Sequence, residues 1–306
     1  MLKVVVFGGS GFLGSHVADE LSIRGYDVTI FDIKNSNYLI ENQKMVVGDI
    51  LERDSVRAVI KKCDIVFHFA AIADIQEAKD NPVKAANFNI IGTMNILDAC
   101  REFQIKRFVY SSTIYVYSEH GSFYRSSKQA CELFIENYQK EYGIDFTVLR
   151  YGSLYGKRAN NFNFIKCCIR QALLEGKINR KGDGEEIRDY VNVLDAARLS
   201  VDSLEDRYIN SYLMITGPQT MKVKELLMMI KEILNNSIEI NYISESMEGH
   251  YKITPYSFKP KVALKINPND YHDLGQGMLE SIYEIYEEII EEGLKPIHFE
   301  GVKYEK

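Results

Sequence analysis

Three glycines near the amino terminus constrain the fold of this chain more than any other feature. Gly8, Gly11 and Gly14 form the pattern GxxGxxG, which follows an apolar β-branched segment (2–7) and opens a segment with helical periodicity (14–24). Glycine lets the backbone turn sharply and lets a pyrophosphate approach the amide N–H groups, while the start of a helix adds unpaired donors. The pattern predicts a dinucleotide-binding turn; the alternative is an ordinary glycine-rich turn.

An aspartate at the end of the next predicted strand (27–31) supports the same site. A carboxylate at Asp32 can accept both ribose hydroxyls of an adenosine, and it repels a 2′-phosphate, which favours NAD over NADP. The alternative is an aspartate that only serves a turn. We assign Phe12 and Leu13, inside the glycine motif, to the cofactor site as well.

Strand and helix patterns alternate through the first half of the chain. Short apolar strands separated by helices predict βαβ units, a doubly wound parallel sheet of the Rossmann type and an α/β fold. After Gly156 the pattern changes, and we expect a smaller mixed substrate domain. The predicted domains are 1–156, rejoined by part of 189–217, and 157–306. The predicted strands are 2–7, 27–31, 44–47, 63–69, 107–110 and 145–149, and the helices are 14–24, 55–62 with Asp54 as N-cap, 89–103, 126–142, 164–174, 222–234 and 278–292.

Composition excludes several classes of function. The 306 residues carry 37 Lys+Arg and 43 Asp+Glu, a formal charge of −6, and 46% are hydrophobic. The acidic balance argues against general nucleic-acid binding, which needs a basic surface. No apolar run approaches the ~18 residues of a membrane span and no signal-peptide pattern precedes the glycine motif, so we expect a cytoplasmic protein. The five cysteines and six histidines match no metal-site spacing, so we expect no metal, and buried, reduced thiols.

A tyrosine and a lysine lie four positions apart where the predicted helix 126–142 begins. If this segment is helical, Tyr124 and Lys128 project from one helix face. A phenol with its ordinary pKa of ~10 is a poor base, and a nearby ammonium would lower that pKa toward the working range. Ser111 and Thr113 follow the strand 107–110, at the sheet edge where α/β proteins bind ligands, so a hydroxyl there could share a proton with Tyr124. Alone, the pair could equally be two solvated side chains.

Taken together, these motifs resemble the extended short-chain dehydrogenase/reductase family, in its NAD-dependent nucleotide-sugar epimerase/dehydratase branch. The resemblance covers nearly the whole chain, and each piece is short but occurs in the family's order. The matching segments are 8–14, Asp32, 48–50, 68–71, 89–93, 111–113, Tyr124 with Lys128, 149–152 and 188–190.

The resemblance implies roles for individual positions. Tyr124 would be the general base and acid, Lys128 would hold the nicotinamide ribose and tune Tyr124, and Thr113 would be the hydroxyl partner. Arg188, assisted by Arg158, would grip a nucleotide-sugar diphosphate, although Arg188 could instead pair with a neighbouring carboxylate. Ser153 is a further substrate residue. The remaining cofactor positions implied are Asp49, Ile50, Phe69, Ala70, Ala71, Asn89, Ser111 and Tyr151.

Departures from the family pattern narrow the expected reaction. Dehydratases of this branch carry an Asp-Glu pair, and decarboxylases a Glu, where this chain has Ile114 and Tyr115. We therefore disfavour both activities and expect redox chemistry at a sugar hydroxyl carbon, foremost a 4-epimerase acting through a 4-keto sugar. A net 4-dehydrogenase or 4-ketoreductase is the alternative, followed by a non-catalytic NAD-binding regulator and a steroid or flavonoid reductase. The nucleotide stays open, because the family's base-reading pair is not recognisable around 254–261.

The resemblance also implies a homodimer. In this family the helices that match 89–103 and 126–142 pair across a two-fold axis. The apolar residues Ile96, Leu97, Leu133 and Phe134 could form that seam, or they could belong to the core of one chain.

Overall fold

The computed structural model describes residues 1–218, 220–243, 250, 252, 263–267 and 270–297. Its centre is an eight-stranded sheet in the order β13-β10-β6-β5-β4-β1-β2-β3, with every neighbouring pair parallel. The predicted doubly wound parallel sheet is thereby confirmed. The strands are β1 Lys3–Phe7, β2 Asp27–Asp32, β3 Gln43–Val47, β4 Ile65–His68, β5 Arg107–Thr113, β6 Phe146–Tyr151, β10 Ser211–Ile215 and β13 Leu264–Ile266.

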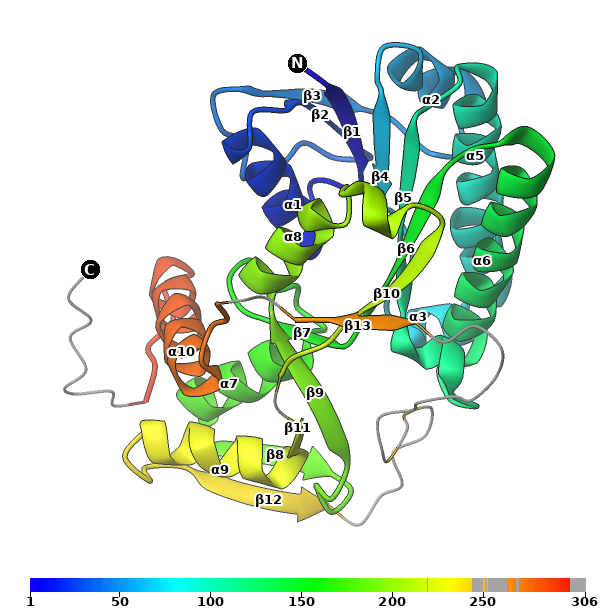
Figure 1. The fold of residues 1–306 in the computed structure, drawn as a ribbon. Coiled ribbons are helices and arrows are strands. Elements are labelled where there is room, and N and C mark those ends of the chain that lie inside the picture. The colour runs from blue at the N-terminus through cyan, green and yellow to red at the C-terminus, as the bar shows by residue number, and fades with distance from the viewer. Residues whose placement is uncertain (219, 244–249, 251, 253–262, 268–269, 298–306) are drawn as a thin grey trace.

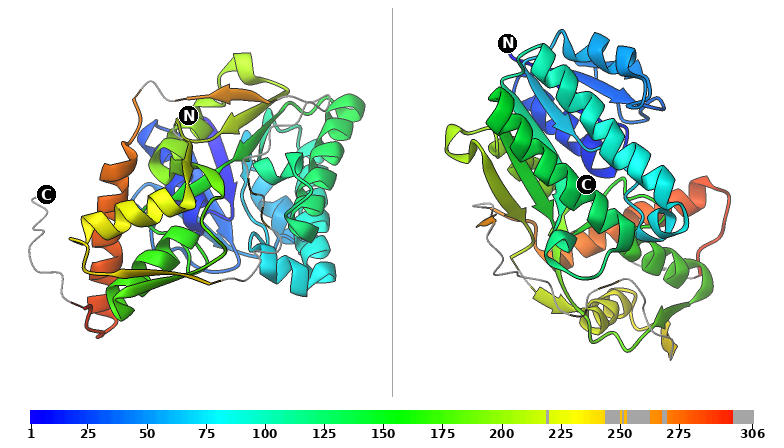
Figure 2. Two further views of the ribbon diagram at one scale, coloured as in Figure 1. Left: turned by 90° about the horizontal axis from the view of Figure 1, so that it is seen from below. Right: turned by 90° about the vertical axis from the view of Figure 1, so that its right-hand side faces the viewer.

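Helices cover both faces of this sheet (Figure 1). α1 (Phe12–Ile23) and α8 (Val193–Asp202) pack on one face, where Val4 and Val6 of β1 point. Three helices cover the opposite face, and the two longest, α5 and α6, lie side by side there (Figure 2). Because both faces are covered, the central strands are apolar throughout. The three helices are α2 Arg53–Ile60, α5 Gly92–Glu102 and α6 Ser122–Tyr142.

The second half forms a smaller unit of two further sheets and three helices around a core of its own. Its three-stranded sheet has the order β11-β9-β7, and β8 pairs with β12 in the other. The chain then returns, because β10 joins the large sheet beside β6. The elements of this unit are β7 Ser153–Tyr155, α7 Phe164–Glu175, β8 Lys177–Lys181, β9 Ile187–Asn192, β11 Thr220–Lys222, α9 Val223–Ile233, β12 Glu239–Ile243 and α10 Leu274–Glu291.

Several boundaries differ from the sequence prediction. α2 begins at Arg53 after the N-cap Glu52, so Asp54 lies in the first turn and not at the cap. β5 extends to Thr113, and α6 begins at Ser122, which brings Tyr124 inside the helix. In each case the backbone hydrogen bonding of the helix or strand extends beyond the predicted boundary. Apolar periodicity alone does not report this extension.

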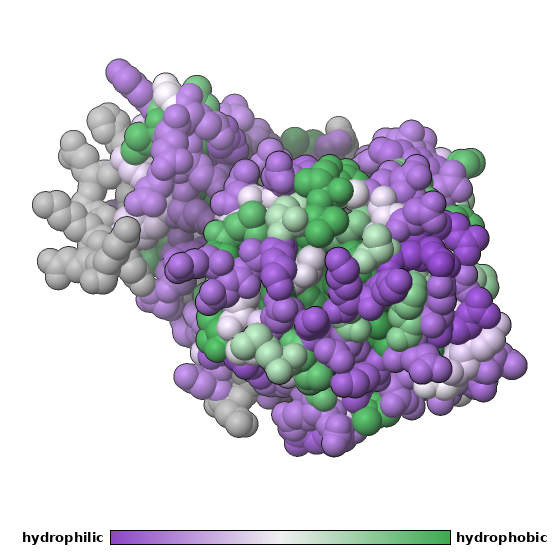
Figure 3. Space-filling model, turned by 90° about the horizontal axis from the view of Figure 1, so that it is seen from above, coloured by the Kyte–Doolittle hydropathy of each residue, from purple (hydrophilic) through white to green (hydrophobic). Residues whose placement is uncertain are grey.

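The apolar residues considered for a dimer seam divide into two pairs. Ile96 and Leu97 are fully buried in the core between α5 and the sheet, so they are core residues of this chain. Leu133 and Phe134 of α6 are 57% and 37% exposed. The surface seen from above mixes apolar with polar side chains (Figure 3).

Cysteine burial departs from the expectation at one position. Cys100, Cys131 and Cys168 are buried and Cys63 is half-buried, but Cys167 is exposed on α7, where its Sγ contacts the Asn161 carbonyl. Within the described parts of the chain, no helix is both long and apolar enough to cross a bilayer.

A histidine lies inside the core at the end of β4. His68 pairs through Nε2 with Thr93 Oγ1 at 2.9 Å, and the rings of Phe7, Phe108 and Tyr110 surround it. Burial lowers its pKa from 6.5 to about 3. The imidazole is therefore neutral in the folded protein at neutral pH, and folding excludes a proton that the unfolded chain binds in mild acid.

We expect His68→Leu to make the free energy of unfolding depend less steeply on pH in mild acid. Between its folded and unfolded pKa values, His68 binds a proton only when unfolded, so wild-type stability falls as pH decreases through 6.5. The variant loses the bond to Thr93 and is less stable near pH ~7.5, but between pH ~7 and ~5 its stability should fall less steeply. Urea unfolding across this range measures both slopes, and parallel curves would contradict the assignment.

Candidate active site

Two loops at the carboxyl ends of β1 and β4 form a tight cradle. Gly8 has φ +77°, and a Cβ on it would lie 2.5 Å from the Ala70 amide nitrogen; a Cβ on Gly14 would collide with the Gly8 carbonyl. Gly11 caps α1 without any side-chain cap, so the first N–H groups of the helix stay available for a ligand. This geometry fits a bound pyrophosphate.

Asp32 adds a carboxylate beside this cradle. Its Oδ2 accepts from the Ser10 amide at 3.0 Å, and Ser10 Oγ donates to the Lys34 carbonyl, so the glycine loop and the segment after β2 are tied together. The carboxylate stands at the end of β2, where it can meet an adenosine ribose. The residues present therefore fit a dinucleotide.

Other sequence-assigned cofactor residues lie around the same edge of the sheet in different roles. Asn89 bridges the Ile72 backbone at 2.7 and 3.1 Å to Ser127 Oγ at 2.9 Å, so its buried amide positions the loop after β4 against α6. Asp49 accepts from the Leu51 amide. The remaining members are Ile50, buried in the core beside α5; Phe69, stacked on Phe67; Ala70 and Ala71 in the loop after β4; and Tyr151, whose hydroxyl pairs with Ser200 Oγ.

The structure brings Tyr124, Lys128 and Thr113 together. Tyr124 lies close enough to Thr113 for that side chain to lower the pKa of the phenol, and Lys128 Nζ donates to the Ser111 carbonyl at 2.7 Å, with the centre of the Tyr124 ring 5.9 Å away. Burial raises the pKa of Tyr124 to about 12 and lowers that of Lys128 to about 8. The net direction for Tyr124 is opposite to the lowering expected from Lys128, because desolvation of the phenolate is the largest effect.

A buried ion pair supports the strand and the helix that carry these groups. Glu132, two helical turns after Tyr124, accepts from Arg150 Nη2 at 2.6 Å and from Ser112 Oγ at 2.5 Å. The Arg150 guanidinium also lies between the rings of Tyr117 and Tyr212. The pair therefore fixes the end of β5, which carries Thr113, against α6, which carries Tyr124.

A cavity of about 420 Å³ is lined by residues 73–76 and Tyr115, which follow strands of the large sheet, and by residues of the smaller unit. Two of the four sequence-assigned substrate residues, Ser153 and Arg188, line it, whereas Thr113 and Arg158, like Tyr124 and Lys128, are not among the described residues that do. Tyr115 and His250 also line it and are joined by a hydrogen bond of 2.7 Å. Burial is the largest influence on the pKa of His250, which lies below 6.5, so its ring is neutral at neutral pH.

With the fold, the cradle and the cavity described, comparison with known proteins decides the family. Residues 4–210 match the model of the "NAD dependent epimerase/dehydratase family". The chain belongs to that family. Its cofactor is NAD, which the cradle and Asp32 fit.

Similar proteins of this epimerase/dehydratase family cover almost the full length of the chain. A Methanocaldococcus jannaschii protein named "Putative UDP-glucose 4-epimerase" is 31% identical over 86% of this chain and 94% of its own. A Bacillus cytotoxicus UDP-N-acetyl-alpha-D-glucosaminuronate decarboxylase is 27% identical over 84% of this chain and 86% of its own. The solved UDP-glucose 4-epimerase of Thermotoga maritima, 26% identical, matches 94% of this chain and 100% of its own with a TM-score of 0.80.

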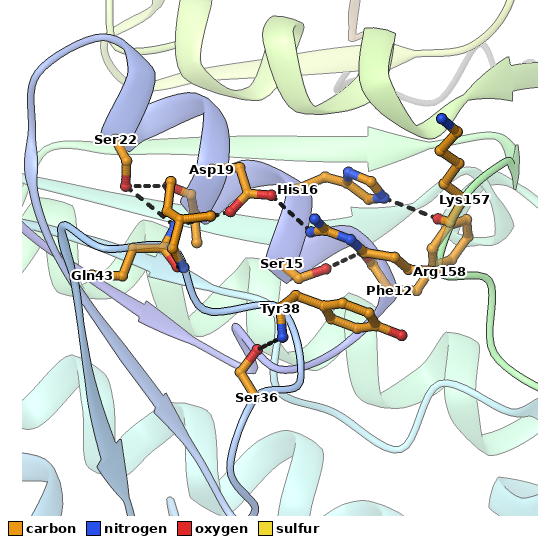
Figure 4. Close-up of polar contacts among 12 residues, drawn as sticks. Phe12, Ser15, His16, Asp19, Ser22, Ser36, Tyr38, Gln43, Lys157 and Arg158 are labelled. Carbon is orange, nitrogen blue, oxygen red and sulfur yellow. Dashed lines mark hydrogen bonds and ion pairs between the residues drawn. The ribbon is translucent and has the colours of Figure 1, made fainter. Parts of the chain in front are cut away.

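Arg158, assigned to the substrate from the sequence, lies elsewhere in this family member. It is not among the described residues that line the cavity. Its Nη1 pairs with Asp19 of α1 at 2.8 Å, and its guanidinium lies 4.4 Å from the Tyr38 ring (Figure 4). Glu284 accepts from the Arg158 backbone amide. Arg158 therefore joins α1, the loop after β2 and α10 behind the cofactor cradle.

Arg158→Met distinguishes a structural role, in which Arg158 links segments of the fold, from a substrate-binding role. We expect the loss of an ion pair and a cation–π contact to lower the free energy of unfolding by about 1–2 kcal/mol. The KM for a nucleotide sugar should stay within about twofold of wild type, because no substrate contact is removed. Thermal unfolding and steady-state kinetics measure the two effects. A large rise in KM without loss of stability would show that Arg158 binds the substrate.

Sequence reasoning missed the groups that support the site. Glu132 had a visible signal, since it lies four and eight positions after Lys128 and Tyr124 on the same helix face. Arg180 on β8 and Glu186 before β9 had none, because their pairing at 2.7 Å depends on a turn that brings two strands of different sheets together.

Proposed function

We propose that this chain is a nucleotide-sugar 4-epimerase that keeps its NAD through the reaction. The observation that carries the proposal is that Tyr124 and Thr113 come together at the end of β5, with Lys128 one helical turn after Tyr124 on α6. This arrangement suits removal of a proton from one sugar hydroxyl and its later return. NAD, held by the glycine cradle and Asp32, would supply reversible hydride transfer at the same carbon.

In this mechanism Thr113 and Tyr124 hold the sugar hydroxyl, and Tyr124 takes its proton. A phenol with a pKa of about 12 needs a positive charge nearby to act as a base. Lys128, with a pKa of about 8, is protonated at neutral pH and lies 5.9 Å from the ring. That charge, and with it the support for a phenolate, is lost as the pH rises through about 8. The 4-keto sugar then turns over, and Tyr124 returns the proton.

The residues after Thr113 favour epimerisation over decarboxylation. Ile114 is buried against Met214 and Ala263, and Tyr115 bonds His250, so no carboxylate follows the catalytic hydroxyl. Decarboxylation is the second candidate, because decarboxylases stand among the relatives at identities close to those of the epimerases. A net 4-dehydrogenase or 4-ketoreductase remains the third.

We further propose a uridine diphosphate sugar as the substrate. Two similar solved structures are epimerases of such sugars: the Thermotoga maritima protein and a UDP-N-acetylglucosamine 4-epimerase of Methanobrevibacter ruminantium, 27% identical with a TM-score of 0.81. Arg188 in the cavity suits a diphosphate, since a guanidinium can donate to two oxygens.

Product analysis tests the proposal. The purified protein, with no added cofactor, is mixed in turn with UDP-glucose, UDP-N-acetylglucosamine and UDP-glucuronate, and products are separated while absorbance at 340 nm is followed. A new isomer without lasting absorbance supports the epimerase. Release of CO₂ from the uronate would establish the decarboxylase, and lasting absorbance that grows with free NAD would establish the dehydrogenase.

We also propose a homodimer through α5 and α6. Leu133 and Phe134 form an exposed apolar pair on α6, and burying both would stabilise association by roughly 2–4 kcal/mol. The Leu133→Glu/Phe134→Glu variant should therefore sediment as a monomer when the wild type sediments as a dimer. Retention of the wild-type mass would place the interface elsewhere.

A further inference from the structure

A second ion pair lies at the cavity, and the mechanism above does not use it. Arg180 on β8 and Glu186 just before β9 are each 7% exposed, and Arg180 Nη2 donates to Glu186 Oε1 at 2.7 Å. Desolvation offsets most of the attraction in such a pair, so stability alone is a weak reason for its presence. Arg180 also lines the cavity, which gives the pair access to a ligand.

Arg180 and Glu186 each keep a polar atom that makes no hydrogen bond. Arg180 Nε and Glu186 Oε2 are buried and have no hydrogen-bond partner among the described residues. An unsatisfied buried polar atom costs about 1–3 kcal/mol. The Phe164 ring, which also lines the cavity, lies 4.8 Å from the Arg180 guanidinium. The cavity wall thus holds a guanidinium fixed by Glu186 and Phe164, and the ion pair keeps one unused donor and one unused acceptor.

The position of the pair assigns it to one end of the substrate. β8 lies with β12 and α9 at the end of the molecule remote from β4 and β5 (Figure 1). Tyr124 and Thr113 hold the reacting sugar at the large sheet. A nucleotide sugar that placed its sugar there and the rest of its length in the cavity would bring its nucleoside to Arg180 and Phe164, which line that cavity together with Tyr115.

We propose that Arg180, held by Glu186 and Phe164, reads the carbonyl edge of the nucleobase and selects uracil; this rests on the proposed function. Arginine offers donors only, so it needs a carbonyl, and Glu186 can accept from the ring N–H beside that carbonyl. The pair is neutral as a whole, which suits an uncharged base better than a second phosphate. Uracil and guanine both carry a carbonyl beside a ring N–H. A cavity of about 420 Å³ that must also hold a diphosphate and a sugar favours the smaller ring.

Binding of nucleotides without any sugar tests this inference apart from turnover. Calorimetry with UDP, CDP, GDP and inorganic pyrophosphate is run on the wild type, Arg180→Met, Arg180→Lys and the control Lys177→Met, which lies on the opposite face of β8. We expect Arg180→Met to bind UDP at least about tenfold more weakly while its pyrophosphate binding is unchanged. Arg180→Lys keeps a charge for Glu186 and the fold, and should lose the preference for UDP over CDP. Lys177→Met should match the wild type.

An exposed cysteine provides a second readout. Cys167 lines the same cavity and is the exposed cysteine of the five. Bound UDP should slow its alkylation in the wild type and in Lys177→Met, and do so at least tenfold less effectively at equal concentration in Arg180→Met. UDP methylated at N3 should bind the unaltered protein at least tenfold more weakly than UDP. This comparison tests recognition of the N3 edge of uracil even if the variants fold poorly.

The outcomes separate the two proposals. Wild-type affinity for UDP in both Arg180 variants, or equal weakening of UDP and pyrophosphate, would overturn the base-reading role. So would tighter binding of GDP than of UDP by the wild type, with the redox function left intact. Arg180-dependent UDP binding by a protein that converts no nucleotide sugar would overturn the proposed epimerase and leave the base-reading role standing.

Discussion

Tyr124→Phe is expected to reduce turnover by about 10²–10⁴-fold while the protein stays folded. The substitution removes one hydroxyl, the group that lies near Thr113 and takes the substrate proton in the proposed mechanism. The ring stays in place beside Lys128, so packing changes little. Because an interaction of the reaction step is lost and not one of ground-state binding, kcat should fall while KM changes little.

Tyr142→Phe supplies the matched control on the same helix. Tyr142 is exposed at the last residue of α6, about five helical turns from Tyr124 along the helix axis. Initial rates, NAD content and UDP affinity are measured for both variants. Turnover by Tyr124→Phe within about tenfold of the control would remove Tyr124 from the proton transfer.

Glu132→Gln is expected to cost about 3–5 kcal/mol of unfolding free energy, a large share of the ~5–15 kcal/mol that stabilises a typical protein. The change leaves the Arg150 guanidinium charged and buried, with side-chain exposures of the pair at 3% and 7% in the wild type. It also weakens the bond to Ser112, which fixes the end of β5. Chemical unfolding gives the stability, and residual activity at low temperature reports the geometry of Thr113.

A double variant tests the physical cause. If the cost comes from an uncompensated charge, Glu132→Met combined with Arg150→Met should be more stable than Glu132→Gln, because the buried charge disappears with its partner. A double variant that is even less stable would show that packing around Tyr117 and Tyr212, and not charge, dominates at this position.

The large sheet and the cofactor cradle were within reach of the sequence for a physical reason. Strand β1, the glycine loop and α1 follow one another directly, so local patterns carry their structure. Tyr124 and Lys128 are likewise one helical turn apart. Such features depend on neighbours in the chain, and periodicity records them.

What the sequence left open depends on contacts between distant segments. Arg158 was assigned to the substrate, yet its side chain meets Asp19 and Tyr38, which precede it by more than a hundred positions. The pKa of Tyr124 depends on burial by the folded chain, which a helical spacing does not report. The partner of Arg180 is set by how two small sheets meet.

The return of the chain to the large sheet after the smaller unit limits how this protein can be divided. β10 pairs with β6, and α8 packs on α1, although both come after the excursion through β7, α7, β8 and β9. A gene fragment ending at residue 156 would lack both elements, uncover one edge of β6 and strip one face of α1. The nucleotide-binding half is therefore not a portable module. Recombination that exchanges the second half must carry replacements for β10 and α8 along with any new substrate preference.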